Sequence, residues 1–283
     1  MTKIALINLK KWRTDPVIYL VFGLIVVFVI YLFGPIYPFA AEHDETISAW
    51  IVSAYFTPVH MTILYVALLG LMFSNAPFYD ASAQFSVVRV GRLRWILGQV
   101  VYVFAASFLM VAAIWLATWL RYLPRLSFAD DWGRVVKSMI LNGQLSSEYP
   151  MRVYLPNIAN TFEPIKTAVL SFVMMWLGTT FGGMLLMFTS FFFGKVVSFS
   201  VFGFFWFMSM VPMWMAQMGW GKYALYACPF NYLNIYYTFE YNGMEGLPPF
   251  AYCVSMLAVT IVIFATATVI GFCRRDLDAG KEE

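Results

Sequence analysis

The chain has 283 residues, of which 61% are hydrophobic and only 12% are charged, and its formal net charge is +3. A soluble domain is about 45–50% apolar and about 25% charged, so a water-soluble monomer of this size cannot bury so much apolar surface. The same figures exclude disordered, collagen-like and coiled-coil proteins, and three cysteines are too few for a small disulfide scaffold. The composition therefore predicts an integral membrane protein.

Six stretches longer than 20 residues contain no charged residue. A helix of about 20 apolar residues crosses the hydrocarbon core, and a helix satisfies its own backbone there. The alternating segments of about 10 residues that indicate a membrane β-barrel do not occur, so we expect an all-α integral membrane fold in a single transmembrane domain. The six predicted transmembrane helices cover residues 17–37, 51–74, 95–120, 165–191, 196–217 and 250–272.

An even number of spans places both termini on one side of the membrane. If that side is the cytoplasm, the inner segments contain 11 Lys and Arg in 41 residues, and the outer segments contain 7 in 74. This bias predicts a multi-pass protein of the cell membrane with both termini cytoplasmic. The apolar run 17–33 is too long for a secretory signal peptide, so we expect the first span to remain in the mature protein.

Residues 1–15 are predicted to form a short amphipathic helix, which Asp15-Pro16 ends. One face of this helix carries Met1, Ala5, Leu9 and Trp12. Such a helix can lie in the inner headgroup layer, and its predicted membrane anchor consists of Lys10, Lys11 and Trp12. The alternative is a basic tail that only sets the topology.

A second short helix is predicted within residues 78–92, between the second and third spans. Pro77 stops the span before it, and Gly91 separates it from the span that follows. A separate short helix on the cytoplasmic side is suited to docking on another protein, whereas the alternative is an ordinary basic loop. The predicted docking residues are Phe85 and Val88, which share one face, with Arg89 and Arg92 one turn further on.

Two segments on the outer side are predicted to contain structure of their own. The outer loop 121–164 contains an amphipathic helix, which either packs on the bundle or acts as a lid. Its apolar positions are Trp132, Val135, Val136, Met139 and Ile140. The segment 218–249 is rich in aromatic residues and interrupted by Pro229, which favours a re-entrant element over a full span. An aromatic belt at the interface is the alternative.

Sequence motifs of catalysis are absent. The chain has no Walker A motif, no GxSxG, no HExxH and no CxxC, so we expect neither an enzyme nor a metal site, and no cofactor in this chain. His60 is the ionisable residue within the predicted spans, and it either lines a polar path or bonds to a neighbouring helix. Further candidates for a path are Met174, Met208 and Met213, for which plain packing is the alternative. A disulfide between Cys228 and Cys253 is possible by position only.

The order of these elements resembles the permease subunit of a type-2 ABC exporter. The local sequence is also similar to Gram-positive permeases of this family between Leu71 and Gln99. The residues concerned are Phe73-Ser74-Asn75-Ala76-Pro77-Phe78, Arg89-Val90-Gly91-Arg92, Trp95 and Gly98-Gln99. The resemblance implies that 1–15 is an interfacial elbow helix, that 78–92 is the coupling helix, and that 218–249 re-enters the outer leaflet.

The resemblance also implies partners. These are a separate ABC ATPase subunit, which would bind ATP and Mg, a second permease chain, identical or paralogous, and membrane lipid, but no nucleic acid. The first, second and fifth spans would line the path, and the apolar lining suits an amphiphilic peptide, a lipid or a hydrophobic drug. Two other readings are open: a membrane sensor or assembly subunit that transports nothing, and a lipid-modifying enzyme that uses Asp130, Asp131 and Glu163.

Overall fold

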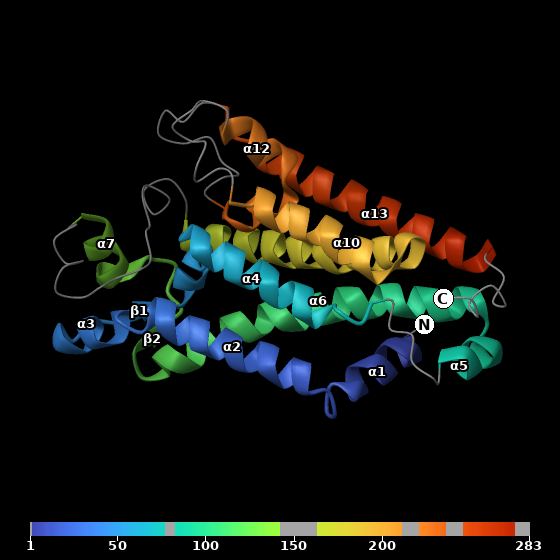
Figure 1. Ribbon diagram of the computed structural model, residues 1–283. Coiled ribbons are helices and arrows are strands. Elements are labelled where there is room, and N and C mark those ends of the chain that lie inside the picture. Colours follow the sequence, from blue (N-terminus) through green and yellow to red (C-terminus); the bar gives the residue numbers. More distant parts are fainter. Residues whose placement is uncertain (1, 77–82, 142–162, 211–220, 236–245, 275–283) are drawn as a thin grey trace.

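The computed structural model describes residues 2–76, 83–141, 163–210, 221–235 and 246–274, and these residues form a bundle of long helices (Figure 1). Some of the described helices are long and apolar enough to cross a membrane. They are Pro16–Phe33, Arg92–Arg125, Pro164–Met208 and Phe250–Arg274. The prediction of a helical fold is therefore confirmed, and these helices support a membrane protein.

The N-terminal part consists of α1 (Thr2–Lys11), α2 (Pro16–Phe33) and α3 (Ile36–Glu42). The Asp15 carboxylate accepts a hydrogen bond from the backbone N–H of Val17 at 2.9 Å, and so caps α2. The first span was expected to continue to residue 37, but α2 ends at Phe33. Pro35 has no backbone N–H to donate, so the chain begins the new helix α3 after it.

The second predicted span, 51–74, is not one continuous helix. It is divided into the 3-10 helix η1 (Ala49–Ala54) and α4 (Val59–Met72). Pro58 lies between them with an extended backbone (φ −78°, ψ 123°), and a proline disfavours the helical conformation of the residue before it. A broken backbone is tolerated at membrane depth where protein covers it, and most of η1 is buried.

The short helix that we expected before the third span is present. It is α5 (Ala83–Val90), and residues 77–82 of the predicted 78–92 element lie outside the described part of the chain. Gly91 separates α5 from α6 (Arg92–Tyr122) with a φ of 90°, a conformation that glycine adopts without steric cost. Helix α6 therefore begins at Arg92, before residue 95, where the third span was predicted to start.

The end of the bundle away from α5 carries a small structured unit that the sequence predicted only in part. Here η2 (Leu123–Arg125) leads into β2 (Leu126–Ser127), which pairs in parallel with β1 (Ile47–Ser48). The helix α7 (Gly133–Leu141) follows, where an amphipathic helix was expected. We call residues 36–48 and 123–141 the cap. Trp132, Val135 and Val136 are buried in the cap, which favours packing over a lid.

The fourth and fifth predicted spans form α10 (Pro164–Met208), which is broken at Gly194 (φ 82°, ψ 169°). The Ser198 hydroxyl lies 3.1 Å from the Leu186 carbonyl, although a straight helix would separate these residues by about 18 Å. The chain therefore folds back at Gly194, as the predicted turn between 191 and 196 requires. Residues 211–217, at the end of the fifth predicted span, lie outside the described residues.

The C-terminal part contains α12 (Gly221–Ala227), the 3-10 helix η4 (Pro229–Leu233) and α13 (Phe250–Arg274). All five residues of η4 are buried. The Phe230 ring packs 5.6 Å from Phe181 and 5.5 Å from Phe202, between centroids, and Leu233 fits against Gly178. These aromatic residues belong to the core and not to an interfacial belt.

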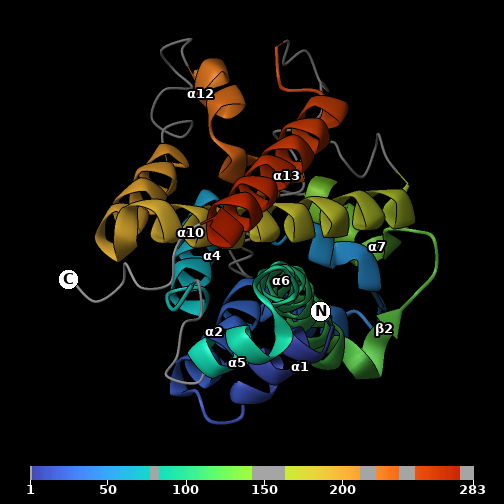
Figure 2. The same cartoon turned by 90° about the vertical axis from the view of Figure 1, so that its right-hand side faces the viewer.

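Helix α6 lies at the centre of the bundle. Seen along its axis, α1, α2 and α5 lie on one side of it, and α10 and α13 lie on the other (Figure 2). Helix α1 packs directly on α6, because Gly98 leaves room for Ile4, where a Cβ would approach to 2.7 Å. The Asn8 amide also donates to Gln99 Oε1 at 2.6 Å, inside this contact.

Candidate partner-docking site

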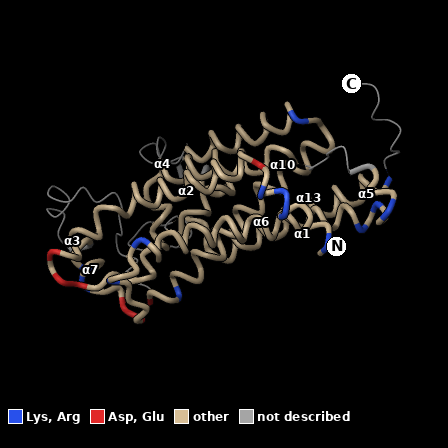
Figure 3. The backbone as a smooth tube through the Cα atoms, turned by 90° about the horizontal axis from the view of Figure 1, so that it is seen from below, with Lys and Arg blue, Asp and Glu red and all other residues tan. Residues whose placement is uncertain are grey.

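Acidic residues gather toward one end of the bundle, whereas basic residues occur at both ends (Figure 3). The end with α1 and α5, which we call the basic end, has Asp15 as its acidic residue within the described ranges, and Asp15 caps α2. The other described acidic residues belong to the cap or to the start of α10. The basic residues described at the basic end are Lys3, Lys10, Lys11, Arg13, Arg89, Arg92, Arg94, Lys195 and Arg274.

Helix α5 presents an unusual surface at the basic end. Phe85 is 79% exposed and Val88 is 82% exposed, and Arg89 on the same helix is also exposed. Val87, between them, is buried and attaches the helix to the bundle. Of the predicted docking residues, Phe85, Val88 and Arg89 therefore lie together on an open face.

The fourth predicted docking residue is placed differently. Arg92 begins α6 and is half-buried, whereas the neighbouring Leu93 and Arg94 are exposed. Helical spacing within 78–92 did not single out these two residues, because Gly91 starts a new helix and changes which side chains face outward. The exposed face thus consists of Phe85, Val88 and Arg89 on α5, with Leu93 and Arg94 beside it.

Val87 belongs to a compact apolar group, which we call the basal cluster. Its buried members are Ile4, Val87, Trp95, Ile96, Phe191 and Phe272. They come from α1, α5, α6, α10 and α13, and the ring centroids of Trp95 and Phe272 are stacked 5.1 Å apart. This cluster therefore connects α5, through α6, with α1, α10 and α13.

The predicted membrane anchor lies beside this cluster. Lys10 and Lys11 are exposed at the end of α1, and the Trp12 indole N–H donates to the Tyr102 hydroxyl at 2.9 Å. Trp12 is thus held by α6. The anchor itself remains a prediction.

The face of α1 that contacts protein differs from the expected one. Its buried residues are Ile4, Ala5 and Asn8, whereas Leu6 and Ile7 are each 55% exposed. Asn8 is polar but buried because it bonds to Gln99. The exposed leucine and isoleucine are consequently the apolar residues that α1 offers to lipid.

The candidate path residues do not gather around one space. Met174 is fully buried in the core, and Met208 is partly buried on the far side of the turn at Gly194. His60 is exposed, and its ring meets the edge of the Tyr31 ring with centroids 6.1 Å apart. Met213 lies outside the described residues. Their part in a path stays a prediction.

Polar groups inside the bundle are few and mostly paired. The Tyr65 hydroxyl and the Thr179 hydroxyl lie 2.6 Å apart between α4 and α10. Three buried polar atoms have no hydrogen-bond partner in the described part: Tyr55 OH, Ser107 Oγ and Trp115 Nε1.

The three cysteines are free thiols, so the possible disulfide between Cys228 and Cys253 is not formed. No group of three metal-ligating side chains occurs among the described residues.

The acidic residues considered for an enzyme have local structural contacts. Asp130 accepts a hydrogen bond from the Ile165 backbone N–H at 3.3 Å, at the start of α10. Asp131 pairs with Lys137 at 2.7 Å, and this hydrogen bond lowers the pKa of the Asp131 carboxyl. Glu163 precedes α10 and makes no side-chain capping bond.

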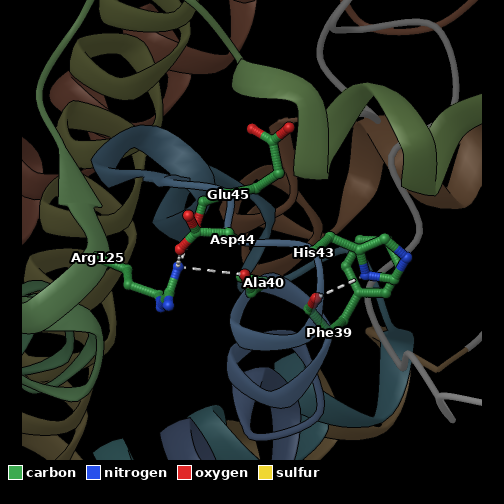
Figure 4. A network of polar contacts seen from close by, with 6 residues as sticks. All are labelled: Phe39, Ala40, His43, Asp44, Glu45 and Arg125. Carbon is green, nitrogen blue, oxygen red and sulfur yellow. Dashed lines mark hydrogen bonds and ion pairs between the residues drawn. The ribbon is translucent and has the colours of Figure 1, made fainter.

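The cap is held by a polar network around Arg125 (Figure 4). Its guanidinium donates to the Asp44 carboxylate at 3.0 Å and to the carbonyls of Ala40 and Glu45 at 3.5 and 3.4 Å. His43 Nδ1 lies 3.0 Å from the Phe39 carbonyl, within α3. These contacts bind the cap to itself and leave the open face at the basic end as the strongest candidate for a partner.

Comparisons with protein-family models, with curated proteins and with solved structures found no match to the chain. The functional argument therefore depends on the geometry of the basic end. That geometry combines a short helix with open apolar side chains, an excess of basic residues, and a buried cluster that connects the helix to the rest of the bundle.

Proposed function

We propose that the chain is the membrane-spanning permease subunit of an ATP-driven ABC exporter of the type-2 family. In this proposal, α5 is the coupling helix that docks on a separate ATPase subunit, and α1 is the elbow helix at the inner membrane surface. ATP and Mg bind to the partner, and this chain binds no cofactor.

The observation that carries the proposal is the exposure of α5. Large apolar side chains that are about 80% exposed, at a polar and charged end of a membrane protein, are costly to leave in water. The rest of the described chain leaves Phe85 and Val88 uncovered. A pocket on a cytoplasmic subunit would bury both side chains, with Phe85 as the anchor.

Charge supports the same partner. Arg89 and Arg94 flank the apolar residues and are exposed, so acidic side chains on the ATPase would pair with them at the rim of the contact. The excess of basic residues at this end also agrees with a cytoplasmic position for both termini, since Ile4 and Phe272 meet in the basal cluster.

The basal cluster supplies a route for coupling. When ATP closes the ATPase dimer, a displaced α5 would push through Val87 on Trp95 and on the stacked Phe272. The elbow helix would move with them, because Ile4 lies in the same cluster. The two-state element is then the interface between two permease chains, identical or paralogous.

Six crossings follow if the broken elements are counted as spans. They are α2, η1 with α4, α6, the two halves of α10, and α13. The buried η4 would belong to a segment that re-enters the outer leaflet, with protein covering its backbone.

The substrate proposed is an amphiphilic peptide, a lipid or a hydrophobic drug, with His60, Met174, Met208 and Met213 as path candidates.

The test is co-purification of the full chain with its ATPase in mild detergent. Val88→Asp places a charge in the proposed apolar contact, and we expect it to lose the ATPase. Val196 is a matched control, because it is also 82% exposed and follows Gly194 at the same end. Val196→Asp should therefore retain the ATPase. Equal retention in both variants would contradict docking through α5.

A second measurement separates transport from a sensor or assembly role. The purified complex is placed in lipid vesicles and its ATP hydrolysis is measured with candidate amphiphiles. A permease predicts stimulation by a transported compound and loss of stimulation in Val88→Asp. A complex that assembles through α5, but shows no stimulation and no accumulation of any compound, would favour the sensor or assembly subunit.

A further inference from the structure

Two shallow apolar concavities lie on the outward face of α6, away from α5. One has a volume of about 640 Å³ and runs from α6 toward α10, and the other has a volume of about 420 Å³ and runs toward α2. Both are lined by Ala113 and Leu116, so they adjoin along the helix. The small side chains of Ala112, Ala113 and Ala117 make the hollow. We call the two concavities together the α6 trough.

The part of the trough that lies on α6 is about as long as one leaflet of a bilayer, and Trp12 extends the lining toward the basic end. Its lining on α6 extends from Phe108 to Arg121, which is about 20 Å at the helical rise of about 1.5 Å per residue. One leaflet with its headgroup region is about 20–22 Å thick, which is half of the full bilayer. Trp12 and Phe22, with ring centroids 5.6 Å apart, line the end nearer the basic end.

Arg121 stands at the other end of the trough, next to the cap. Its guanidinium lies 5.1 Å from the centre of the Tyr37 ring, which holds it in place. The other basic residues of this region, Arg125, Arg134 and Lys137, each pair with a carboxylate. Arg121 pairs with none among the residues that the structure describes, so its charge is available to a ligand that enters the trough.

We propose that the α6 trough binds one phosphoglyceride from the leaflet on the cap side of the membrane. The lipid phosphate pairs with Arg121, and an acyl chain lies along Ala113 and Leu116 toward Phe22. The lining is almost entirely apolar apart from Arg121, which matches a ligand with a single anionic group at one end. A lipid whose headgroup has a net negative charge binds more tightly than a zwitterionic one, because the cation of a zwitterionic headgroup competes with Arg121 for the phosphate.

The charge of the trough favours a lipid over a helix of a second chain. Arg121 at one end of an otherwise apolar lining matches a single anionic headgroup, whereas an apolar helix would offer it no partner. The flanking Trp50 and Trp119 indoles donate hydrogen bonds to the backbone carbonyls of Ala129 and Ala49, respectively. Such tryptophans are typical of a headgroup boundary. This inference does not rest on the proposed transport function.

The experiment is native mass spectrometry of the full chain in detergent, titrated with palmitoyl-oleoyl phosphatidylglycerol. We expect one tightly retained lipid per chain. Arg121→Ala should weaken its binding about tenfold or more, because a charge-assisted contact is lost. Ala113→Leu should weaken it similarly by filling the trough, and Arg121→Lys should retain most of the affinity as a cation of the same charge.

Matched controls separate the trough from general effects of charge and bulk. Arg274→Ala removes an exposed arginine from the basic end, and Ala251→Leu enlarges an exposed alanine on α13; both should bind the lipid as the unaltered chain does. Unchanged lipid binding in Arg121→Ala and Ala113→Leu would overturn the proposal. Loss of a chain dimer in Ala113→Leu with lipid binding intact would also overturn it, in favour of a helix contact.

Discussion

At the cap, Arg125 binds one carboxylate and two carbonyls, Arg134 binds Glu45, and Lys137 binds Asp131. At the basic end, nine described basic residues face one described acid, and that acid caps a helix. In the cap, each of these three basic side chains therefore pairs with a carboxylate, whereas the described residues of the basic end carry an excess of positive charge. This difference is why the proposed partner contact is placed at the basic end and not at the cap.

The largest expected effect would come from Trp95→Ala. Truncation of a buried aromatic side chain costs about 3–5 kcal/mol, and Trp95 contributes to the contact of α5 and α13 with α6. We expect a lower melting temperature in detergent together with loss of partner binding at the basic end. Trp132→Ala in the cap is the matched variant. It should lower stability comparably but leave partner binding intact, and the same loss of binding in both would remove the contrast between the ends.

A smaller effect is expected from Arg125→Ala, which opens the network of Figure 4. Hydrogen bonds to a charged group contribute about 1.5–3 kcal/mol, and the Arg125 side chain is only 27% exposed. Amide hydrogen exchange should increase in residues 40–48 and remain unchanged at α5. Arg134→Ala is the control, since its side chain is 83% exposed and its single pair is worth about 1 kcal/mol or less.

The contact of α1 with α6 gives a third test. Gln99→Leu leaves the buried Asn8 amide without its acceptor, which costs about 1–3 kcal/mol. Replacing both residues, Asn8→Leu with Gln99→Leu, removes the unsatisfied group and should restore much of the stability. The measurement is unfolding of each variant in the same detergent. A double variant less stable than the single one would mean that the hydrogen bond is not what holds Asn8 in this contact.

The smallest effect concerns pH. The hydrogen bond from Lys137 lowers the pKa of Asp131, so this pair stabilises the fold above the ordinary aspartate value of about 3.9. Its contribution is lost as the pH falls through the lowered pKa of the folded state. Lys137→Met should move the pKa of Asp131 back toward the ordinary value, as measured by the carboxyl carbon shift in NMR. The same pKa in both proteins would contradict the pairing.

The parts of the fold that depend on long apolar runs could be predicted from the sequence. The last span was expected at 250–272 and α13 covers Phe250–Arg274, because few other structures can bury an uncharged run of this length. The turn at Gly194 was also foreseen. The break at Pro58 was not predicted, because a charge-free run has the same composition whether it forms one helix or two.

The candidate site could be predicted less completely. The exposed Phe85 and Val88 follow from helical spacing, but Leu93 and Arg94 depend on the direction in which α6 leaves Gly91. The burial of Asn8 depends on Gln99, which is 91 residues away and invisible to a local pattern. The two-residue strands of the cap have no alternation long enough to detect.

The pairing of Ile47 with Leu126 also sets an order of events during synthesis. The two strands are separated by η1, α4, α5, α6 and η2, so the cap cannot close before all of these elements have been synthesised. Until then β1 has no partner strand, because nearly eighty residues must be added between Ile47 and Leu126. The closed cap therefore forms late in synthesis, after α6.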